Sequence, residues 1–544
     1  MGKPVYISSV GLTKVDLTGR VFGSVFDLFA EAVEKALVDS RVRSFGALQI
    51  GIMDSEEFEN RANIAAKVAD RLGLRGIPAV RSETASSTGA AAFHEACFKV
   101  ASGEFESVLV VAGERMKNVT TQEATAIMSK TVDPVERRFG FTMPALIALV
   151  TQAWLRERGI PPDQAREILS RLMARAHALG GENPLAAFYG KFEPQVAYFD
   201  ETRNLPVATP LMRKDCSPIC DGAAAVIVTS RPGPVRVAGL GSATETSSIL
   251  DRSALGHMDA TRQAARLAYW RAGIAEPAEL ENVVVEAHDA FNSLLPIDLV
   301  DLGLADPENA VEYLVGDLSS PAPHPLANPV TGPGGRLAVN LSGGLKARGH
   351  PVGGTGLFQI SECFLQMVGR FPSPRAQMQR ADVGIAHSIG GPGNNVYVTV
   401  LEREGANRRR TEVSPPRVLF ERGPRPSAPE VASLDGARAV VEASTTIHVT
   451  GKDSAEPVHV AVVSQAGQRF FAKLDREVDA ELPPEEMLAG RKVRLLVKDE
   501  GDHYFPLAPD GLGIGSLLDK VARRIGFAPA KVEPVDAGED EAAG

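Results

Sequence analysis

The chain has 544 residues, which exceeds one ordinary domain and suffices for two or three. Its 44% hydrophobic and 23% charged residues are typical of a soluble globular protein, and no run of 18 apolar residues is present to span a membrane. The net charge of −10 disfavours nucleic acid as the main partner, although local basic groups can still bind a phosphate-bearing ligand.

The N-terminus and the cysteines both predict a cytoplasmic protein. Residues 1–15 lack the basic start and apolar core of a secretory signal. Cys97, Cys216, Cys220 and Cys363 are scattered, and no second pair or nearby His completes a zinc set. We therefore expect free, buried thiols in a reducing compartment and no bound metal.

Helix and strand patterns alternate through the first three quarters of the chain. Apolar residues at helical spacing predict helices over 25–37 and 89–101. Short apolar runs predict buried strands over 107–113, 221–228 and 283–287. This alternation predicts α/β layers with mostly parallel strand pairing.

A weak internal repeat indicates that this part of the chain is duplicated. Thr88 and Thr355 each precede a Gly and open a helical segment that carries a Glu seven residues further on. Each segment leads to an apolar strand. We therefore predict two similar halves, 1–232 and 233–402, with residues 115–215 inserted in the first half.

Composition changes after the second half. Residues 403–430 are rich in Pro and Arg, which predicts a linker. Residues 431–530 hold short alternating segments separated by turn residues, which predict a small antiparallel, OB-like β-barrel. The acidic composition of residues 531–544 predicts a disordered tail.

Two polar stretches carry the most specific pattern of the chain. Residues 83–89 have the sequence Glu-Thr-Ala-Ser-Ser-Thr-Gly, and residues 340–351 have the sequence Asn-Leu-Ser-Gly-Gly-Leu-Lys-Ala-Arg-Gly-His-Pro. The second stretch resembles the Gly-His-Pro signature of the thiolase family. The first resembles the segment in which that family carries its nucleophilic cysteine, and Ser86 stands in the place of that cysteine.

Further motifs resemble the thiolases that are fused to sterol carrier protein, over residues 4–402. Residues 286–291 have the sequence Glu-Ala-His-Asp-Ala-Phe, where that subfamily has His-Asp-Cys-Phe, so Ala290 fills the place of its second cysteine. Most other thiolases carry this second cysteine in a Cys-x-Gly motif, and the corresponding place here holds His387 or Ser388. Both known positions of the second cysteine are therefore empty, as in thiolase-like proteins that lack the catalytic cysteines.

The resemblance implies a duplicated five-layer α/β fold with a loop domain that covers CoA. Its implied ligand is CoA or a CoA thioester, which is a substrate and not a covalently bound cofactor. The implied assembly is a homodimer, or a monomer if the C-terminal barrel changes it. The catalytic cleft is expected to hold Ser86, His288, His350 and His387. The glycine loops, whose backbone can approach a ligand closely, are formed by Ser342, Gly343, Gly344, Gly353 and Gly354.

The serine changes the expected chemistry. A cysteine thiolate is accessible near neutral pH because the thiol pKa is about 8.5 and a helix N-terminus lowers it further. The hydroxyl of Ser86 needs a general base within hydrogen-bond reach, and its acyl ester is more stable than a thioester. Ala290 cannot act as the second base. Because groups that act as a unit fail together, we expect weak or absent thiolase turnover.

Two classes of function are left open by the sequence. The first is an enzyme of the acyltransferase class, similar to acetyl-CoA acetyltransferase, that transfers an acyl group through Ser86 or cleaves a C–C bond in a retro-aldol-like reaction through the histidines. The second is a non-catalytic protein that holds acyl-CoA, with the C-terminal barrel as the docking module for a protein partner. Neither nucleic acid nor a membrane is expected as a partner.

Overall fold

A computed structural model describes residues 2–406, 408, 410–416, 437–448, 457–465, 467–473, 492–495 and 507–509. The chain forms two compact units, one of residues 1–423 and 445–457 and the other of residues 424–444 and 458–544. Parts of the predicted linker and of the predicted barrel, and all of the predicted acidic tail, lie outside the described residues.

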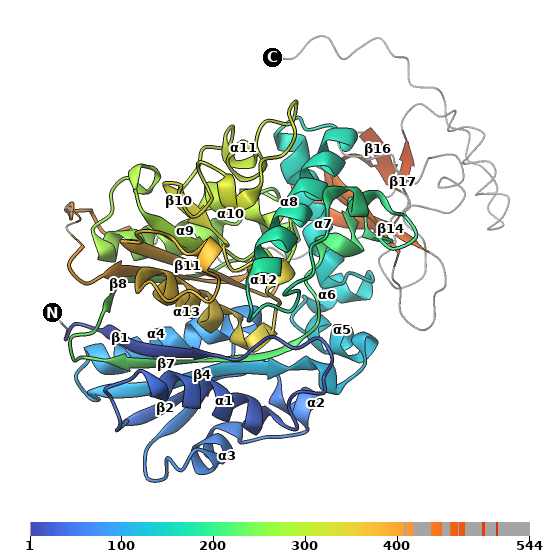
Figure 1. The fold of residues 1–544 in the computed structure, drawn as a ribbon. Helices are drawn as coiled ribbons and strands as arrows, with labels where there is room; N and C mark the ends of the chain where they lie inside the picture. The colour runs from blue at the N-terminus through green and yellow to red at the C-terminus, as the bar shows by residue number, and fades with distance from the viewer. Residues whose placement is uncertain are drawn as a thin grey trace, which may run out of the picture. The chain divides into compact units, whose positions relative to one another are not determined.

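A mixed ten-stranded sheet runs through the first unit (Figure 1). Its strands, in chain order, are β1 (Tyr6–Leu12), β2 (Ala47–Gly51), β3 (Ala79–Ser82), β4 (Ser107–Arg115), β7 (Asp221–Thr229), β8 (Val235–Thr244), β9 (Val283–Glu286), β10 (Leu337–Val339), β11 (Val383–Gly390) and β12 (Asn395–Arg403). Their order across the sheet is β10-β9-β11-β12-β8-β1-β7-β4-β2-β3. A separate short hairpin consists of β5 (Pro206–Ala208) and β6 (Leu211–Met212).

The sheet consists of two halves with the same topology. In the N-terminal half, β7 pairs antiparallel with β1 and β4, and β2 pairs parallel with β4 and β3. In the C-terminal half, β12 pairs antiparallel with β8 and β11, and β9 pairs parallel with β11 and β10. The predicted duplication is confirmed. The predicted mostly parallel pairing is wrong, because β7 and β12 run against both of their neighbours.

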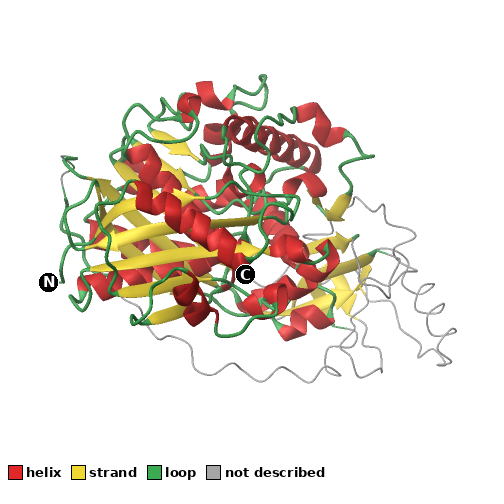
Figure 2. Ribbon diagram, turned by 60° about the horizontal axis from the view of Figure 1, so that its bottom comes forward, coloured by secondary structure: helices red, strands yellow, loops and turns green. Residues whose placement is uncertain are grey.

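Helices form the remaining layers of the fold (Figures 1 and 2). They are α1 (Val25–Val38), α2 (Ser55–Glu59), α3 (Ile64–Arg71), α4 (Thr88–Ala101), α5 (Thr121–Ser129), α6 (Pro134–Arg138), α7 (Met143–Glu157), α8 (Pro162–Glu182), α9 (Asp259–Ala272), α10 (Leu294–Asp301), α11 (Ala310–Val315), α12 (Gly344–Ala347) and α13 (Thr355–Met367). Helices α4 and α13 pack between the two halves of the sheet. Helices α1 and α3 cover the outer face of the N-terminal half, and α9 packs on β8 and β12 of the other half.

The amino-acid pattern explains which helices are central. In α1 only six of 14 residues are buried, in one stripe, as expected for a helix with one solvent face. In α4 ten of 14 residues are buried, and in α13 twelve of 13, as expected for helices enclosed on all sides. The two helices cross closely at their N-termini, where a Cβ on Gly356 would lie 2.5 Å from the backbone nitrogen of Ala90. Both helix N-termini are therefore brought to one place.

The inserted region and the segment after β12 contain features that the sequence pattern did not reveal. The 21-residue helix α8 follows α7 in the inserted region. After β12, Arg408 donates hydrogen bonds to the carbonyl oxygens of Ala272 and Gly273 at the C-terminal end of α9. A cation is favourable there because the helix dipole places partial negative charge at that end. The basic segment is thus held on the protein at this residue.

The second unit contributes short antiparallel strands. β14 (Val458–Gln465) pairs with β15 (Gln468–Lys473), and β16 (Lys492–Leu495) pairs with β13 (Arg438–Ile447) and with β17 (Leu507–Pro509). These pairings agree with an antiparallel sheet, and the closed barrel stays a prediction. In the described part of the chain, no helix is long and apolar enough to cross a membrane.

Candidate active site

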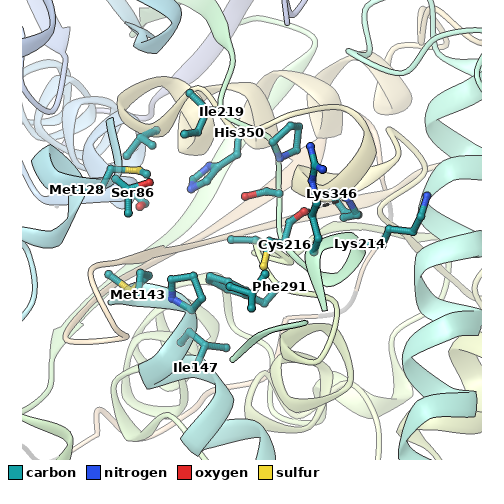
Figure 3. A pocket seen from close by; sticks show the side chains of 18 of the residues that line it. Ser86, Met128, Met143, Ile147, Lys214, Cys216, Ile219, Phe291, Lys346 and His350 are labelled. Carbon is teal, nitrogen blue, oxygen red and sulfur yellow. Dashed lines mark hydrogen bonds between the residues drawn. The ribbon is translucent and has the colours of Figure 1, made fainter. Parts of the chain in front are cut away.

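A cavity of about 790 Å³ lies in the first unit, lined from both halves of the fold and from the inserted region. Figure 3 shows Ser86 and Met128 at one end of it, Lys346 and Lys214 towards the other end, and His350 between them. Such a volume is typical of a small-molecule or cofactor site. The sequence motifs around Ser86, His288 and His350 therefore converge on one cavity.

Ser86 stands in a tight turn between β3 and the N-terminus of α4. The turn, residues 85–87, is a single 3-10 turn, and its first residue, Ala85, has a φ of +52°. This left-handed conformation costs a residue with a Cβ about 1–2 kcal/mol. Two hydrogen bonds hold the turn, from the Thr84 backbone N–H to the Thr88 hydroxyl (2.9 Å) and from the Ser87 hydroxyl to the Thr84 carbonyl (2.8 Å). The strained turn directs half-buried Ser86 into the cavity, near the positive end of α4.

His350 offers a hydrogen-bond acceptor at the cavity. Its Nδ1 lies 2.7 Å from the hydroxyl oxygen of Thr355, and that hydroxyl donates its hydrogen to the carbonyl oxygen of Pro351 at 3.1 Å. We therefore assign the ring proton to Nδ1, which leaves the Nε2 lone pair of His350 free to accept. Burial, with a smaller contribution from Arg348, lowers the pKa of His350 to about 3. The ring is neutral at neutral pH and is a weak base.

His288 offers the complementary donor. Its Nδ1 accepts the backbone N–H of Ile389 at 3.2 Å, so neutral His288 carries its proton on Nε2. Burial first, and then the charges of His350, His387 and Arg348, hold its pKa well below the ordinary value. The rings of His288 and His350 are perpendicular, with centroids 5.3 Å apart. One donor and one acceptor therefore stand side by side in the cavity, as acyl chemistry requires.

The structure does not bring His387 to this cavity. Its ring is fully buried, with Nε2 3.1 Å from the hydroxyl of Thr261 on α9 and Nδ1 3.5 Å from a carboxylate oxygen of Asp298 on α10. Ile389, two residues further along β11, and Gly391, just after the strand, do line the cavity. The packing of α9 and α10 against β11 determines this orientation. His387 is therefore a partner of these helices and not of a ligand.

The predicted glycine loops also lie apart from the cavity lining. Ser342 donates a hydrogen bond to Glu286 at 2.7 Å and is fully buried. At Gly344, which has a φ of +59°, a Cβ would lie 2.1 Å from a carboxylate oxygen of Asp289. The five predicted residues are Ser342, Gly343, Gly344, Gly353 and Gly354, and none is in the lining. The missing Cβ at Gly344 therefore makes room for Asp289 rather than for a ligand.

Basic side chains that the motifs did not single out line much of the cavity. Among the lining residues, Glu193 is acidic and five are cations. The cations are Lys117, Arg203, Arg213, Lys214 and Lys346. Lys346 is buried and donates a hydrogen bond to the Cys216 carbonyl at 2.9 Å; burial lowers its pKa. Lys214 forms an ion pair with Glu193. Four of the cations belong to the inserted region. Because that region was expected to cover CoA, its basic residues could have been predicted to line the cavity.

Apolar side chains line much of the rest of the cavity. Ala290 is one of the lining residues, so a methyl group stands in the cavity at the position where the sequence motif of the sterol-carrier-protein type has a cysteine. Further apolar residues are Met53, Met128, Met143, Ile147, Phe291 and Leu294. Methionine adapts to ligands of different shape. The cavity thus joins a region with a hydroxyl, two imidazoles and apolar side chains to a region with Lys214 and Lys346. In the described residues, no group of three His, Cys, Asp or Glu side chains is arranged to hold a metal ion.

Glu114 joins two of the loops that form the cavity. Its carboxyl is fully buried and accepts backbone N–H groups from Met53 (2.8 Å), Gly353 (3.2 Å) and Asp54 (3.4 Å). Met53 lines the cavity, and Gly353 belongs to the loop that follows His350. The single carboxyl therefore sets the position of the His350 loop relative to the opposite wall.

Replacing Glu114 by Ala is expected to lower the free energy of unfolding by about 2–5 kcal/mol, because buried N–H groups lose their acceptor. Glu114→Gln is the matched control, since its amide oxygen can still accept the N–H groups of Met53 and Gly353. Chemical denaturation followed by circular dichroism gives both values. Equal stability of the Ala variant and the natural chain would contradict the role of this carboxyl.

The same pair of variants has a pH signature. Burial raises the pKa of Glu114 from 4.5 to about 8. Its stabilising contribution is complete below the unfolded pKa and is lost as the pH rises through the folded pKa, because only the unfolded chain releases the proton in between. Between pH 5 and pH 8 the natural chain should therefore lose stability relative to Glu114→Gln. If the difference in free energy of unfolding between the natural chain and Glu114→Gln were the same at pH 5 and pH 8, this prediction would be wrong.

The fold and the cavity together define a class: a duplicated α/β protein with a nucleophile-type turn and paired imidazoles at the junction of its halves. The family described as "Thiolase, N-terminal domain" matches residues 9–180, and the one described as "Thiolase C-terminal domain-like" matches residues 241–403. The acetyl-CoA acetyltransferase of Methanothermobacter thermautotrophicus is 32% identical over 389 residues, which cover 69% of this chain and 94% of the relative. The chain belongs to the thiolase family.

Two further comparisons confirm the resemblance to the sterol-carrier-protein type. Sterol carrier protein 2 of Bos taurus is 26% identical over 436 residues, 76% of this chain and 75% of the relative. The crystal structure of a monomeric SCP2-thiolase like protein type 1 from Mycobacterium smegmatis has a TM-score of 0.65 at 18% identity, and the match covers 93% of this chain and 99% of that chain. The latter similarity supports the fold.

Proposed function

We propose that this protein binds a CoA thioester in the cavity and belongs to the acyltransferase class, with weak or absent thiolase turnover. The proposal rests on one observation: the cavity has basic side chains in one part and Ser86 with two histidines in another. Its cationic end, with Lys214 and Lys346, suits the phosphates of CoA, because charge-assisted hydrogen bonds to phosphate are strong. Its other end presents Ser86, His288 and His350 to the acyl group.

The acyl-transfer step follows from the two imidazoles. The Ser86 hydroxyl oxygen attacks the thioester carbonyl, and its proton passes to Nε2 of His350. The Nε2–H of His288 stabilises the negative charge on the carbonyl oxygen. The C–S bond then breaks, and the CoA thiolate takes the proton from His350. This leaves an ester on Ser86 and free CoA.

Two features make this step slow. The pKa of His350, lowered to about 3, makes its ring a weak base for a hydroxyl. In the described residues, the hydrogen bonds of His350 and His288 go to Thr355 and to the Ile389 backbone, and none joins them to Ser86. Return of the acyl group from the ester to CoA is uphill. Ser86 is therefore suited to accept an acyl group slowly rather than to shuttle it.

A non-catalytic acyl-CoA-binding role is the second candidate. Ala290 favours it, because the cavity has a methyl group where the condensation reaction needs a base. Altered C–C bond chemistry that uses the histidines is a variant of the first candidate. Binding of a protein partner through the C-terminal strands, a homodimeric or monomeric assembly and a cytoplasmic location remain predictions.

Intact-protein mass spectrometry after incubation with acetyl-CoA separates the two candidates. For acyl transfer we expect the mass of one acetyl group on the natural chain and no adduct on Ser86→Ala. Bound CoA without an adduct would favour the non-catalytic role. Neither adduct nor bound CoA would contradict the proposal in both forms.

A further inference from the structure

Lys117 is a cation of the cavity lining that follows a residue packed near the Ser86 turn. The preceding residue, Met116, belongs to a core cluster with Met53 and Val352, against which Ala85 and Met128 pack. Lys117 itself lines the cavity. Its backbone N–H donates a hydrogen bond to Asp221, and its charge also acts to lower the pKa of that carboxyl, which burial raises. In the part of the chain that the structure describes, its ammonium group makes no salt bridge within 4 Å. An anionic ligand group in the cavity can therefore compete for this charge.

Helix α5 extends the polar wall next to Lys117. Thr121, Thr125 and Ser129 recur every four residues, which places them on one face of the helix, and all three line the cavity. The Thr125 hydroxyl donates to the Thr121 carbonyl (2.8 Å) and the Ser129 hydroxyl to the Ala126 carbonyl (2.7 Å). Within α5 the Thr121 hydroxyl makes no such bond, and α5 contacts the turn of residues 116–118 that contains Lys117. A carboxylate can thus accept from Thr121 and pair with Lys117.

Apolar side chains of α7 line another part of the same cavity. Met143 and Ile147, four residues apart on α7, lie below the cavity in Figure 3, beside Phe291. A chain in contact with both parts would bury its methylene groups against one and meet hydroxyl groups of the other. The arrangement suits an apolar acyl chain with a polar end, rather than an acyl chain that is apolar throughout.

The helix sets the length of this chain. Met128 lies beside Ser86 in Figure 3, and Thr121 is seven residues earlier on α5. At a rise of 1.5 Å per residue this is about 10 Å along the helix, a length that an acyl chain of about eight carbons can span. An acyl chain of about eight carbons laid along α5 from Met128 would therefore end near Thr121.

We propose that the acyl end of the cavity receives a CoA thioester whose acyl chain ends in a carboxylate, with Lys117 as the charge partner of that carboxylate. The proposal rests on the CoA-thioester binding proposed above and names the class of acyl group. It assigns Lys117 and Thr121 to binding and gives them no part in the chemical step.

Isothermal titration calorimetry with three ligands tests the subsite: suberyl-CoA, octanoyl-CoA and free CoA. The first two have eight-carbon chains and differ in the terminal carboxylate. The natural chain should bind suberyl-CoA about 10-fold more tightly than octanoyl-CoA, because a charge-assisted contact is worth about 1.5 kcal/mol. Lys117→Met should abolish this preference and leave the affinity for free CoA unchanged. Lys67→Met, which changes an exposed lysine outside the cavity, is the matched control.

The outcomes separate the subsite from the CoA site. Equal affinity of the natural chain for the two thioesters would overturn the subsite while leaving CoA binding intact. A loss of free-CoA affinity in Lys117→Met would place Lys117 at the phosphates and would also overturn it. Absence of binding for all three ligands would overturn the proposed function and the subsite together. If Lys117→Met does not fold, the natural chain still gives a result, because added salt should reduce the preference for suberyl-CoA.

Discussion

Replacing Ser86 by Cys is expected to produce a covalent acyl-enzyme within minutes of mixing with acetyl-CoA, at a rate at least about 100-fold above that of the natural chain. The physical reason is that a thiol at a helix N-terminus reaches its thiolate near neutral pH, whereas a hydroxyl needs a strong base that His350 cannot be. Rapid-quench mass spectrometry measures both rates, with Ser86→Ala as the blank.

Full turnover is expected to need a second change. CoA-dependent cleavage of acetoacetyl-CoA should be weak in Ser86→Cys and clear in the double variant Ser86→Cys with Ala290→Cys, because the two groups act as a unit. Activity of the natural chain would contradict the account of the missing thiol and would mean that another group is the nucleophile. Full activity of Ser86→Cys alone would show that Ala290 does not limit turnover.

Replacing Lys214 and Lys346 together by Met is expected to weaken CoA binding by at least about 100-fold, since each charge-assisted contact with phosphate contributes about 1.5–3 kcal/mol. Titration calorimetry at low and high salt measures the loss, and the salt dependence should fall with it. Thermal unfolding checks that the variant is folded, because Lys346 also donates a hydrogen bond to Cys216.

Glu193→Gln is the control that removes a negative charge from the cavity instead of positive charges. It removes the carboxylate that pairs with Lys214 and leaves the volume of the side chain almost unchanged. Affinity for CoA should then stay the same or increase. If the double Lys variant bound CoA as tightly as the natural chain, the phosphates would have to lie elsewhere.

Sequence motifs were sufficient to identify the site residues that lie within short, characteristic segments of the chain. Ser86 lies in a strand–turn–helix segment, and His350 and His288 follow from short motifs, so the sequence was sufficient to group them. The duplicated fold was likewise visible, because Thr88 and Thr355 open equivalent helices in the two halves. Each motif is local, and the resemblance to the thiolase family brought the separate motifs together.

Other features depend on packing between distant segments. His387 was expected in the cleft, but α9 and α10 enclose its ring. The glycine at position 344 was expected to approach a ligand, but it makes room for Asp289. The cations at 214 and 346 come from different segments, and their convergence on one cavity depends on how the inserted region folds over the halves. No local pattern encodes these arrangements.

The most direct test of the central claim is the binding of CoA to the natural chain, measured by isothermal titration calorimetry at low salt. The account predicts saturable binding of one CoA per chain, weakened by salt and by the loss of Lys214 and Lys346, even if no reaction follows. No heat of binding at millimolar CoA, under conditions where the chain is folded, would contradict it.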